Sequence, residues 1–122
     1  MGYNDRVEFS ILTGKTLAKI DNSGDEIYFT TVDGERFKMF HDQDCCESVS
    51  VDDIVGDLAD LIGSPILSAY EESSMENPKE SGEDSFTWTF YRISTIKGTV
   101  VIKWYGTSNG YYSESVNFEK VA

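Results

Sequence analysis

The sequence predicts a mostly β protein of the α+β class: a twisted antiparallel sheet or partial barrel of about seven strands, with one short helix. Three observations predict it. β-Branched and aromatic residues alternate with polar residues in several short runs. Clusters of Gly, Asn, Asp and Ser separate these runs, as is typical of turns. Only residues 51–62 carry apolar side chains at a helical spacing. A chain of 122 residues is expected to form a single domain over 1–122.

The N-terminal part of the chain predicts three strands. Residues 1–14 have no clear period and are expected to form an irregular or frayed arm. Strands are expected at residues 15–20, 26–32 and 35–40. Between the last two, Asp33-Gly34 predicts a two-residue type I′ hairpin turn. That turn would place Thr30 opposite Phe37.

The middle of the chain predicts the helix. Its apolar stripe consists of Ile54, Val55, Leu58, Leu61 and Ile62. Ser50 is a suitable N-cap, and Gly63 followed by Pro65 would end the helix, so we expect it over about 51–62. A strand at 66–70 and an acidic loop at 71–85 are expected to follow.

The C-terminal part carries the strongest β pattern. Strands are expected at residues 86–96, 99–105 and 111–121. A turn at Lys97-Gly98 would join the first two. One face of this hairpin would hold Tyr91, Ile93, Val100, Ile102 and Trp104. The third strand is expected to pair beside the second, with Val116 opposite Ile102.

Negative charge is concentrated in residues 41–85. This stretch holds thirteen acids and one base, which gives −12 and equals the net charge of the whole chain. Such a charge disfavours nucleic acid and anionic membranes as partners and favours a basic protein. On a helix, Asp53, Asp57 and Asp60 would form one ridge. The expected partner-binding residues are Asp42, Asp44, Glu47, Asp53, Asp57, Asp60, Glu71 and Glu72.

An aromatic cluster near one end of the sheet supports an alternative function. Aromatic rings combined with amide and hydroxyl groups can hold a planar ligand, so the alternative is a binder that sequesters a small nucleotide signal. Its expected ligand-binding residues are Trp88, Tyr91, Trp104, Tyr105, Asn109, Tyr111 and Tyr112.

A metal site or an enzyme is the third alternative. His41, Cys45 and Glu47 are metal-ligand types, and an extended chain would place them on one side. The sequence contains no CxxC pair, and the adjacent Cys45-Cys46 cannot join distant segments. It also contains no phosphate-binding glycine loop, GxSxG or HExxH motif. We therefore expect a non-enzymatic protein without a cofactor.

Neither a secretory signal nor a membrane span is visible in the sequence. No apolar segment follows Met1, and no run approaches the ~18 apolar residues of a spanning helix. A cytoplasmic location is therefore expected.

Two stretches resemble a known family. They are His41-Asp42-Gln43-Asp44-Cys45-Cys46-Glu47-Ser48-Val49 through Gly63-Ser64-Pro65-Ile66-Leu67, and Phe86-Thr87-Trp88-Thr89-Phe90-Tyr91-Arg92 through Trp104-Tyr105-Gly106-Thr107-Ser108-Asn109-Gly110-Tyr111-Tyr112-Ser113-Glu114. They are similar to a domain-of-unknown-function family of small bacteriophage and prophage proteins. The resemblance implies a small accessory protein in the cytoplasm of a host bacterial cell, of a kind that often counters host defence. It implies no activity and no catalytic residues.

Overall fold

The computed structural model describes residues 6–23, 25–41, 47–74, 85–108 and 116–121. In chain order the elements are the 3-10 helix η2 (Phe9–Leu12), β1 (Leu17–Asn22), β2 (Glu26–Thr31), β3 (Arg36–Phe40), β4 (Ser48–Val55), the 3-10 helix η3 (Leu58–Leu61), β5 (Ser68–Ser74), β6 (Ser85–Thr95), β7 (Gly98–Ser108) and β8 (Asn117–Lys120). The described chain thus has eight strands where about seven were expected, and the prediction of a mostly β fold is confirmed.

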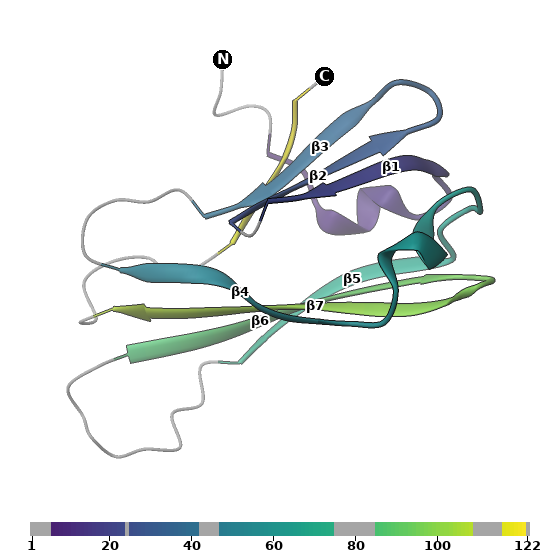
Figure 1. Ribbon diagram of the computed structural model, residues 1–122. Coiled ribbons are helices and arrows are strands. Elements are labelled where there is room, and N and C mark those ends of the chain that lie inside the picture. Colours follow the sequence, from purple (N-terminus) through teal and green to yellow (C-terminus); the bar gives the residue numbers. More distant parts are fainter. Residues whose placement is uncertain (1–5, 24, 42–46, 75–84, 109–115, 122) are drawn as a thin grey trace.

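The strands form two layers. The first sheet has the order β1-β2-β3-β8 and the second the order β4-β7-β6-β5, with antiparallel pairing throughout. Figure 1 shows the two sheets stacked face to face. The described strands do not close into a barrel. The predicted pairing of the last strand beside β7 is wrong, because β8 joins the first sheet, where Phe118 lies opposite Met39.

The β2–β3 hairpin has a longer turn than predicted. Phe29 lies opposite Phe37, so the expected Thr30–Phe37 pairing is off by one residue. The Thr31 carbonyl accepts from the Gly34 amide, and the Thr31 amide donates to the Glu35 carbonyl. Only Gly34 has a positive φ in this turn, at 94°. These features define a three-residue turn with a bulge at glycine in place of the type I′ turn.

The predicted helix at 51–62 is wrong. These residues are divided between β4, a turn at Gly56, and η3. The pairing of β4 with β7 shifts between Val51 and Asp53, which marks a β-bulge. The extra residue lets Val51 and Ile54 both pack on the core, three positions apart. A bulged strand followed by a 3-10 turn therefore imitates the apolar spacing of an α-helix.

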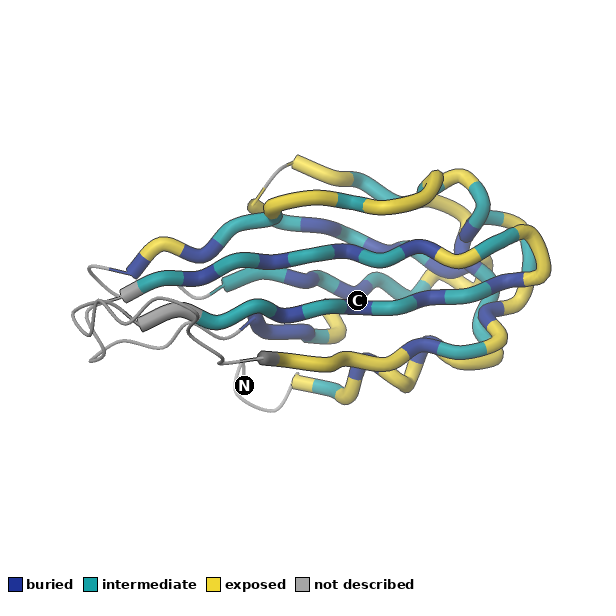
Figure 2. The backbone as a smooth tube through the Cα atoms, turned by 90° about the horizontal axis from the view of Figure 1, so that it is seen from below, coloured by how far each residue is buried: buried dark blue, intermediate teal, exposed yellow. Residues whose placement is uncertain are grey.

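The β6–β7 hairpin confirms the predicted faces. The five residues expected on one face are all buried, with at most 1% of each exposed. The turn itself is one residue earlier than expected: Thr95 pairs with Gly98, so Ile96 and Lys97 form it. Figure 2 shows buried and intermediate residues alternating along the central strands, whereas exposed residues collect on the outer strands and turns.

The N-terminal segment belongs to the core. Residues 1–14 were expected to be irregular, yet η2 buries Phe9 and Leu12 between the sheets. The Phe9 ring packs edge-on against Phe29 and Phe118 of the first sheet and against Tyr91 of the second. A second link joins the layers, because the Trp104 indole N–H donates to Met39 Sδ at 3.1 Å.

Candidate functional site

Three exposed carboxylates lie along one edge of the second sheet. Asp52 and Asp53 belong to the edge strand β4, and Asp57 precedes η3. We call these three residues the β4 acidic edge. Asp53 and Asp57 were predicted as partner-binding residues, whereas Asp52 was not singled out. Asp60, the third member of the predicted ridge, is half-buried, and its carboxyl group faces Gly98 of β7.

Local hydrogen bonds hold the β4 acidic edge in place. Asp53 Oδ1 accepts from the Ile54 amide at 2.8 Å. Asp57 Oδ1 accepts from the Ala59 amide at 3.0 Å and so caps η3. Among the described residues, none of the three acids forms an ion pair.

The opposite edge of the same sheet carries Glu71 and Glu72, on β5. Three strand spacings of about 4.8 Å separate β4 from β5, so the two acidic groups are about 14 Å apart. Glu72 forms an ion pair with Arg92 at 3.1 Å. Glu71 was expected in a loop but lies within β5, opposite Tyr91. The predicted acids are therefore divided between two edges.

Glu47 is not part of a charged surface. Its Oε2 lies 2.6 Å from His41 Nε2, and the two side chains are 0% and 4% exposed. The pair stands where the chain passes from the first sheet to the second. It lines a cavity of about 390 Å³ together with Asp25, Ser48, Val49 and Ser50. A carboxylate that orients an imidazole can support proton transfer, and a buried pair of this kind also fixes a crossover.

The metal alternative concerns the same place. His41 and Glu47 are adjacent, as the extended spacing implied, but Cys45 lies outside the described residues, as do Asp42 and Asp44. Within the described ranges, no three His, Cys, Asp or Glu side chains gather as metal ligands.

The predicted aromatic residues lie on opposite faces of the second sheet. Tyr91 and Trp104 face the core. Trp88 and Tyr105 are paired across β6 and β7 on the outer face, with ring centroids 4.4 Å apart. The remaining predicted ligand-binding residues, Asn109, Tyr111 and Tyr112, lie outside the described residues.

The outer face of the second sheet also holds residues that were not predicted. Phe90 is stacked near Trp88, with centroids 6.2 Å apart and planes at 5°. Lys103 lies between Phe90 and Asp53 in the strand pairing, so it shares their face. Phe90 could have been predicted on this face, because it follows Trp88 by two positions in β6 and side chains alternate along a strand. This face therefore combines stacked rings with an ammonium group.

None of the helices in the described ranges has the length and apolar character needed to cross a bilayer.

The fold and these surfaces define a class: a two-layer antiparallel β protein with an acidic sheet edge and an aromatic outer face. The chain belongs to the family described as "Domain of unknown function (DUF7448)", whose sequence pattern matches residues 10–118. No curated protein and no solved structure shows a significant match to the chain.

Proposed function

We propose that this protein is a binding protein that docks on a basic surface of another protein through the β4 acidic edge. One observation carries the proposal: Asp52, Asp53 and Asp57 are exposed and make no ion pair with the described residues. Three neighbouring carboxylates favour a cationic partner and speed its approach at low salt.

The other charges of the molecule support this assignment. Glu35 is neutralised by Lys15 at 2.9 Å and by Lys120 at 3.1 Å. Glu26 pairs with Lys38 at 3.3 Å. Glu26 and Glu35 of the first sheet are thus paired with bases, whereas Asp25 and Asp33, in its turns, form no ion pair among the described residues. The net charge of −12 leaves the molecule as a whole attractive to a basic partner.

The setting we propose is a phage accessory protein in the cytoplasm of a bacterial host. There it would bind and inhibit a basic, nucleic-acid-handling protein such as a defence nuclease, by taking the place of the nucleic acid. The resemblance of residues 41–67 and 86–114 to small phage and prophage proteins supports this setting, and the acidic edge supports the mode of binding.

The test is a pull-down from bacterial host lysate with the wild type and two matched triple variants. The first carries Asp52→Asn, Asp53→Asn and Asp57→Asn, in which each amide keeps a hydrogen-bond acceptor. The control carries Asp21→Asn, Asp25→Asn and Asp33→Asn, which changes the net charge equally but on the first sheet. We expect the first variant alone to lose the partner.

Two further properties of the recovered partner decide the proposal. Its complex should dissociate as salt is raised, and duplex DNA should compete for it, because both would use the same basic surface. A partner retained by the first variant, or lost equally by both variants, would contradict docking at the β4 edge.

A second candidate function rests on a different observation, the Trp88–Tyr105 ring pair beside Lys103. We infer from it a planar anionic ligand such as a nucleotide, held by stacking and by one ammonium group. Trp88 is half-buried on the outer face and Trp104 is in the core, so a ligand there should quench the fluorescence of Trp88 only. Trp88→Ala should abolish both quenching and binding.

Two sets of variants distinguish the two candidate functions. The triple variant of the β4 acidic edge should still bind the nucleotide, and no more weakly, because it removes the negative charge of Asp53 opposite Lys103. Trp88→Ala should leave the protein partner bound. Saturable quenching by nucleotides that persists in Trp88→Ala would contradict the ligand site.

A further inference from the structure

The outer face of the second sheet is not covered by any described element of the chain (Figure 1). Because side chains alternate along its strands, this face carries five apolar or aromatic residues: Val55, Trp88, Phe90, Val101 and Tyr105. Val55 is 48% exposed, and the other four are half-buried. A continuous apolar face that reaches the surface marks a place where another molecule docks.

The centre of this face has the composition of a protein–protein interface. Trp88 pairs with Tyr105 across β6 and β7, with ring centroids 4.4 Å apart, and Phe90 is stacked near Trp88. Arg92 follows Phe90 by two positions in β6 and shares its face. Tryptophan, tyrosine, phenylalanine and arginine are the residue types most enriched at the centres of such interfaces.

The rings on the outer face of the first sheet are covered differently. There, the chain's own cations lie over them, as Lys38 does at 4.4 Å from the centre of the Phe40 ring. Among the described residues, no cation lies over Trp88 or Phe90. The outward sides of these two rings are therefore open to a molecule from outside.

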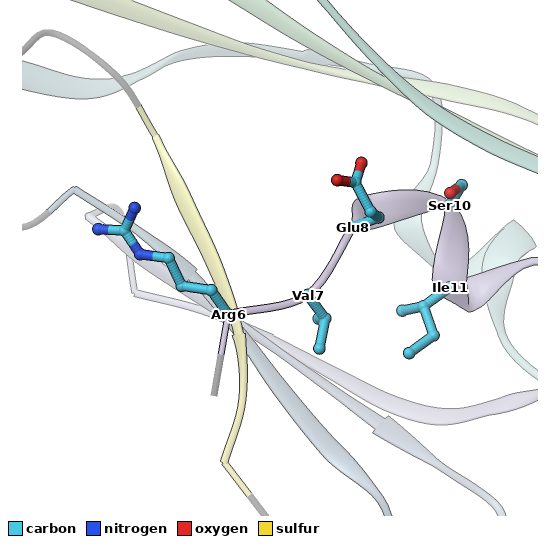
Figure 3. Close-up of a pocket in the computed structure, with 5 residues that line it drawn as sticks. All are labelled: Arg6, Val7, Glu8, Ser10 and Ile11. Carbon is cyan, nitrogen blue, oxygen red and sulfur yellow. The ribbon is translucent and has the colours of Figure 1, made fainter. Parts of the chain in front are cut away.

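The two cavities beside the N-terminal segment do not offer a comparable surface. One, of about 570 Å³, is shallow and lined by this segment alone. Figure 3 shows Glu8 and Ser10 on the opposite side of the segment from Val7, which packs against the core. The other cavity, of about 410 Å³, brings Glu8 near Glu71 and has a mostly polar lining. Neither cavity has the apolar area that a folded protein needs for docking.

The size of the outer face matches a second copy of the chain. Four strands that lie about 4.8 Å apart and rise about 3.3 Å per residue give a face of roughly 19 Å by 30 Å. Side chains add relief to this flat area. The accessible surface therefore approaches the ~800 Å² that each partner buries in a standard interface.

Two-fold symmetry makes the face complementary to itself. If the axis runs between β6 and β7 and parallel to them, β6 of one copy lies over β7 of the other. Since Trp88 and Tyr105 are paired within a copy, this axis sets Trp88 over Tyr105 of the second copy. In the same way, Lys103 lies over the second copy's Phe90 ring, where a cation is attracted by the ring face. Asp53 belongs to an outer strand and stays at the solvated rim of the contact.

We propose that the protein forms a symmetric homodimer through the outer face of the second sheet, with Trp88, Phe90 and Tyr105 at the centre of the contact. The dimer leaves the β4 acidic edge of each copy at the rim, where a basic partner can still reach it. A nucleotide bound at Trp88 would compete with the second copy.

The experiment is sedimentation velocity of the intact protein over a wide concentration range, at low and at high salt. We expect a reversible monomer–dimer equilibrium that shifts toward the dimer as salt is raised, because salt screens the repulsion between two chains of net charge −12. Tryptophan emission should move to shorter wavelengths as the dimer forms. That change reports Trp88, because Trp104 is already buried in the monomer. A chain that stays monomeric under all these conditions would overturn the proposal, as would a dimer without the change in emission.

Two matched variants test the contact. Phe90→Lys sets an ammonium group against Lys103 of the second copy and should weaken the dimer about tenfold or more. Phe40→Lys is the control, because Phe40 is half-buried on the outer face of the first sheet and the change adds the same charge. Equal dimerisation of the two variants would overturn the proposal.

Melting temperatures show whether both variants are folded. If Phe90→Lys is not, Val101→Lys decides the question, because it sets an ammonium group against Arg92 of the second copy.

The dimer and the proposed function can fail separately. The triple variant of the β4 acidic edge should dimerise at least as tightly as the wild type, because it has less negative charge, while it loses the basic partner. Salt should strengthen the dimer and dissociate the partner. A triple variant that is monomeric would place the contact at the β4 edge and overturn the proposal.

Discussion

The first sheet and the β4 edge of the second sheet differ in how their charged side chains are paired. On the first sheet, Lys38 pairs with Glu26 and lies 4.4 Å from the centre of the Phe40 ring. Arg36 lies 4.7 Å from the centre of the Tyr28 ring. Each of these cations has an anionic or aromatic partner beside it. On the second sheet, Asp52 and Asp53 lie at an edge without an ion pair among the described residues.

This difference in charge pairing determines where the described part of the molecule has an uncompensated negative potential. A compensated face has a short-range field, because each positive group offsets a negative one within a few ångströms. Among the described residues, the β4 acidic edge places three exposed carboxylates close together without an ion pair. Net charge alone does not reveal this, since acids of both sheets contribute equally to the total of −12.

The largest expected effect comes from uncoupling the two sheets. Phe9→Ala removes a buried ring that contacts both layers and should lower the free energy of unfolding by about 3–5 kcal/mol. Ile11→Ala is the matched control in the same short helix; Ile11 is 39% exposed, and its loss should cost less than about 1 kcal/mol. Urea denaturation measures both. Similar losses in the two variants would show that η2 does not couple the sheets.

Comparing Glu47→Ala with Asp53→Ala tests whether Glu47 stabilises the fold while Asp53 contributes to the proposed binding. The change at Glu47 removes the buried carboxylate beside His41 and should destabilise the fold by about 3 kcal/mol. Asp53→Ala removes an exposed carboxylate and should change stability by about 0.5 kcal/mol or less while weakening the protein partner. Thermal unfolding measures the stability of both variants, and the pull-down measures their binding. A Glu47→Ala variant that is as stable as the wild type but does not bind the partner would contradict the structural role of Glu47.

A pair of glycine variants compares one turn from each sheet. Gly56 and Gly34 both have positive φ, at 105° and 94°. A Cβ on Gly56 would lie 2.7 Å from the Thr99 carbonyl oxygen, whereas a Cβ on Gly34 would meet nothing within 4 Å. Gly56→Ala should therefore cost about 2–3 kcal/mol and Gly34→Ala about 1 kcal/mol. Equal melting temperatures for the two variants would contradict the close approach of Gly56 to β7.

The smallest effect is a pH dependence of opposite sign on the two sheets. Hydrogen bonds from Lys15 and Lys120 lower the pKa of Glu35, so its stabilisation is present above the ordinary glutamate pKa and is lost as pH falls. Burial raises the pKa of Glu71, so the penalty of its charge is present at neutral pH and is relieved as pH falls. At neutral pH, Glu35→Gln should be less stable than the wild type and Glu71→Gln more stable, and both differences should fade as the pH falls below the ordinary glutamate range and the carboxyl groups are protonated. Differences of the same sign would contradict the comparison.

Much of the fold could be predicted where contacts are local. The faces of the β6–β7 hairpin follow from strict alternation, and Ile93 and Val100 are buried as expected. The partner of β8 could not be predicted, because its pairing with β3 joins residues about eighty positions apart in the chain. The helix error had a specific cause: one inserted residue in β4 changed a spacing of two into a spacing of three.

The sites were less predictable than the fold. The exposure of Asp53 and Asp57 could be expected from their charge. The sequence grouped Glu47 with His41 only as candidate metal ligands, and the burial of both side chains could not be read from it. Glu71 carried a signal that was not used: it follows the buried Ala69 by two positions and so lies on the same side of β5, although it remains exposed at the edge of the sheet. Its proximity to Glu8 depends on how η2 packs and could not be read from either segment.

The bulge in β4 also locks the strand against sliding. If β4 moved by one position along β7, Asp53 would turn toward the hydrophobic interior and Ile54 would turn toward water. A shift by one position would thus carry the Asp53 carboxylate inward. The charge of the exposed aspartates therefore helps to fix the register of β4, although an edge strand has a neighbour on one side only.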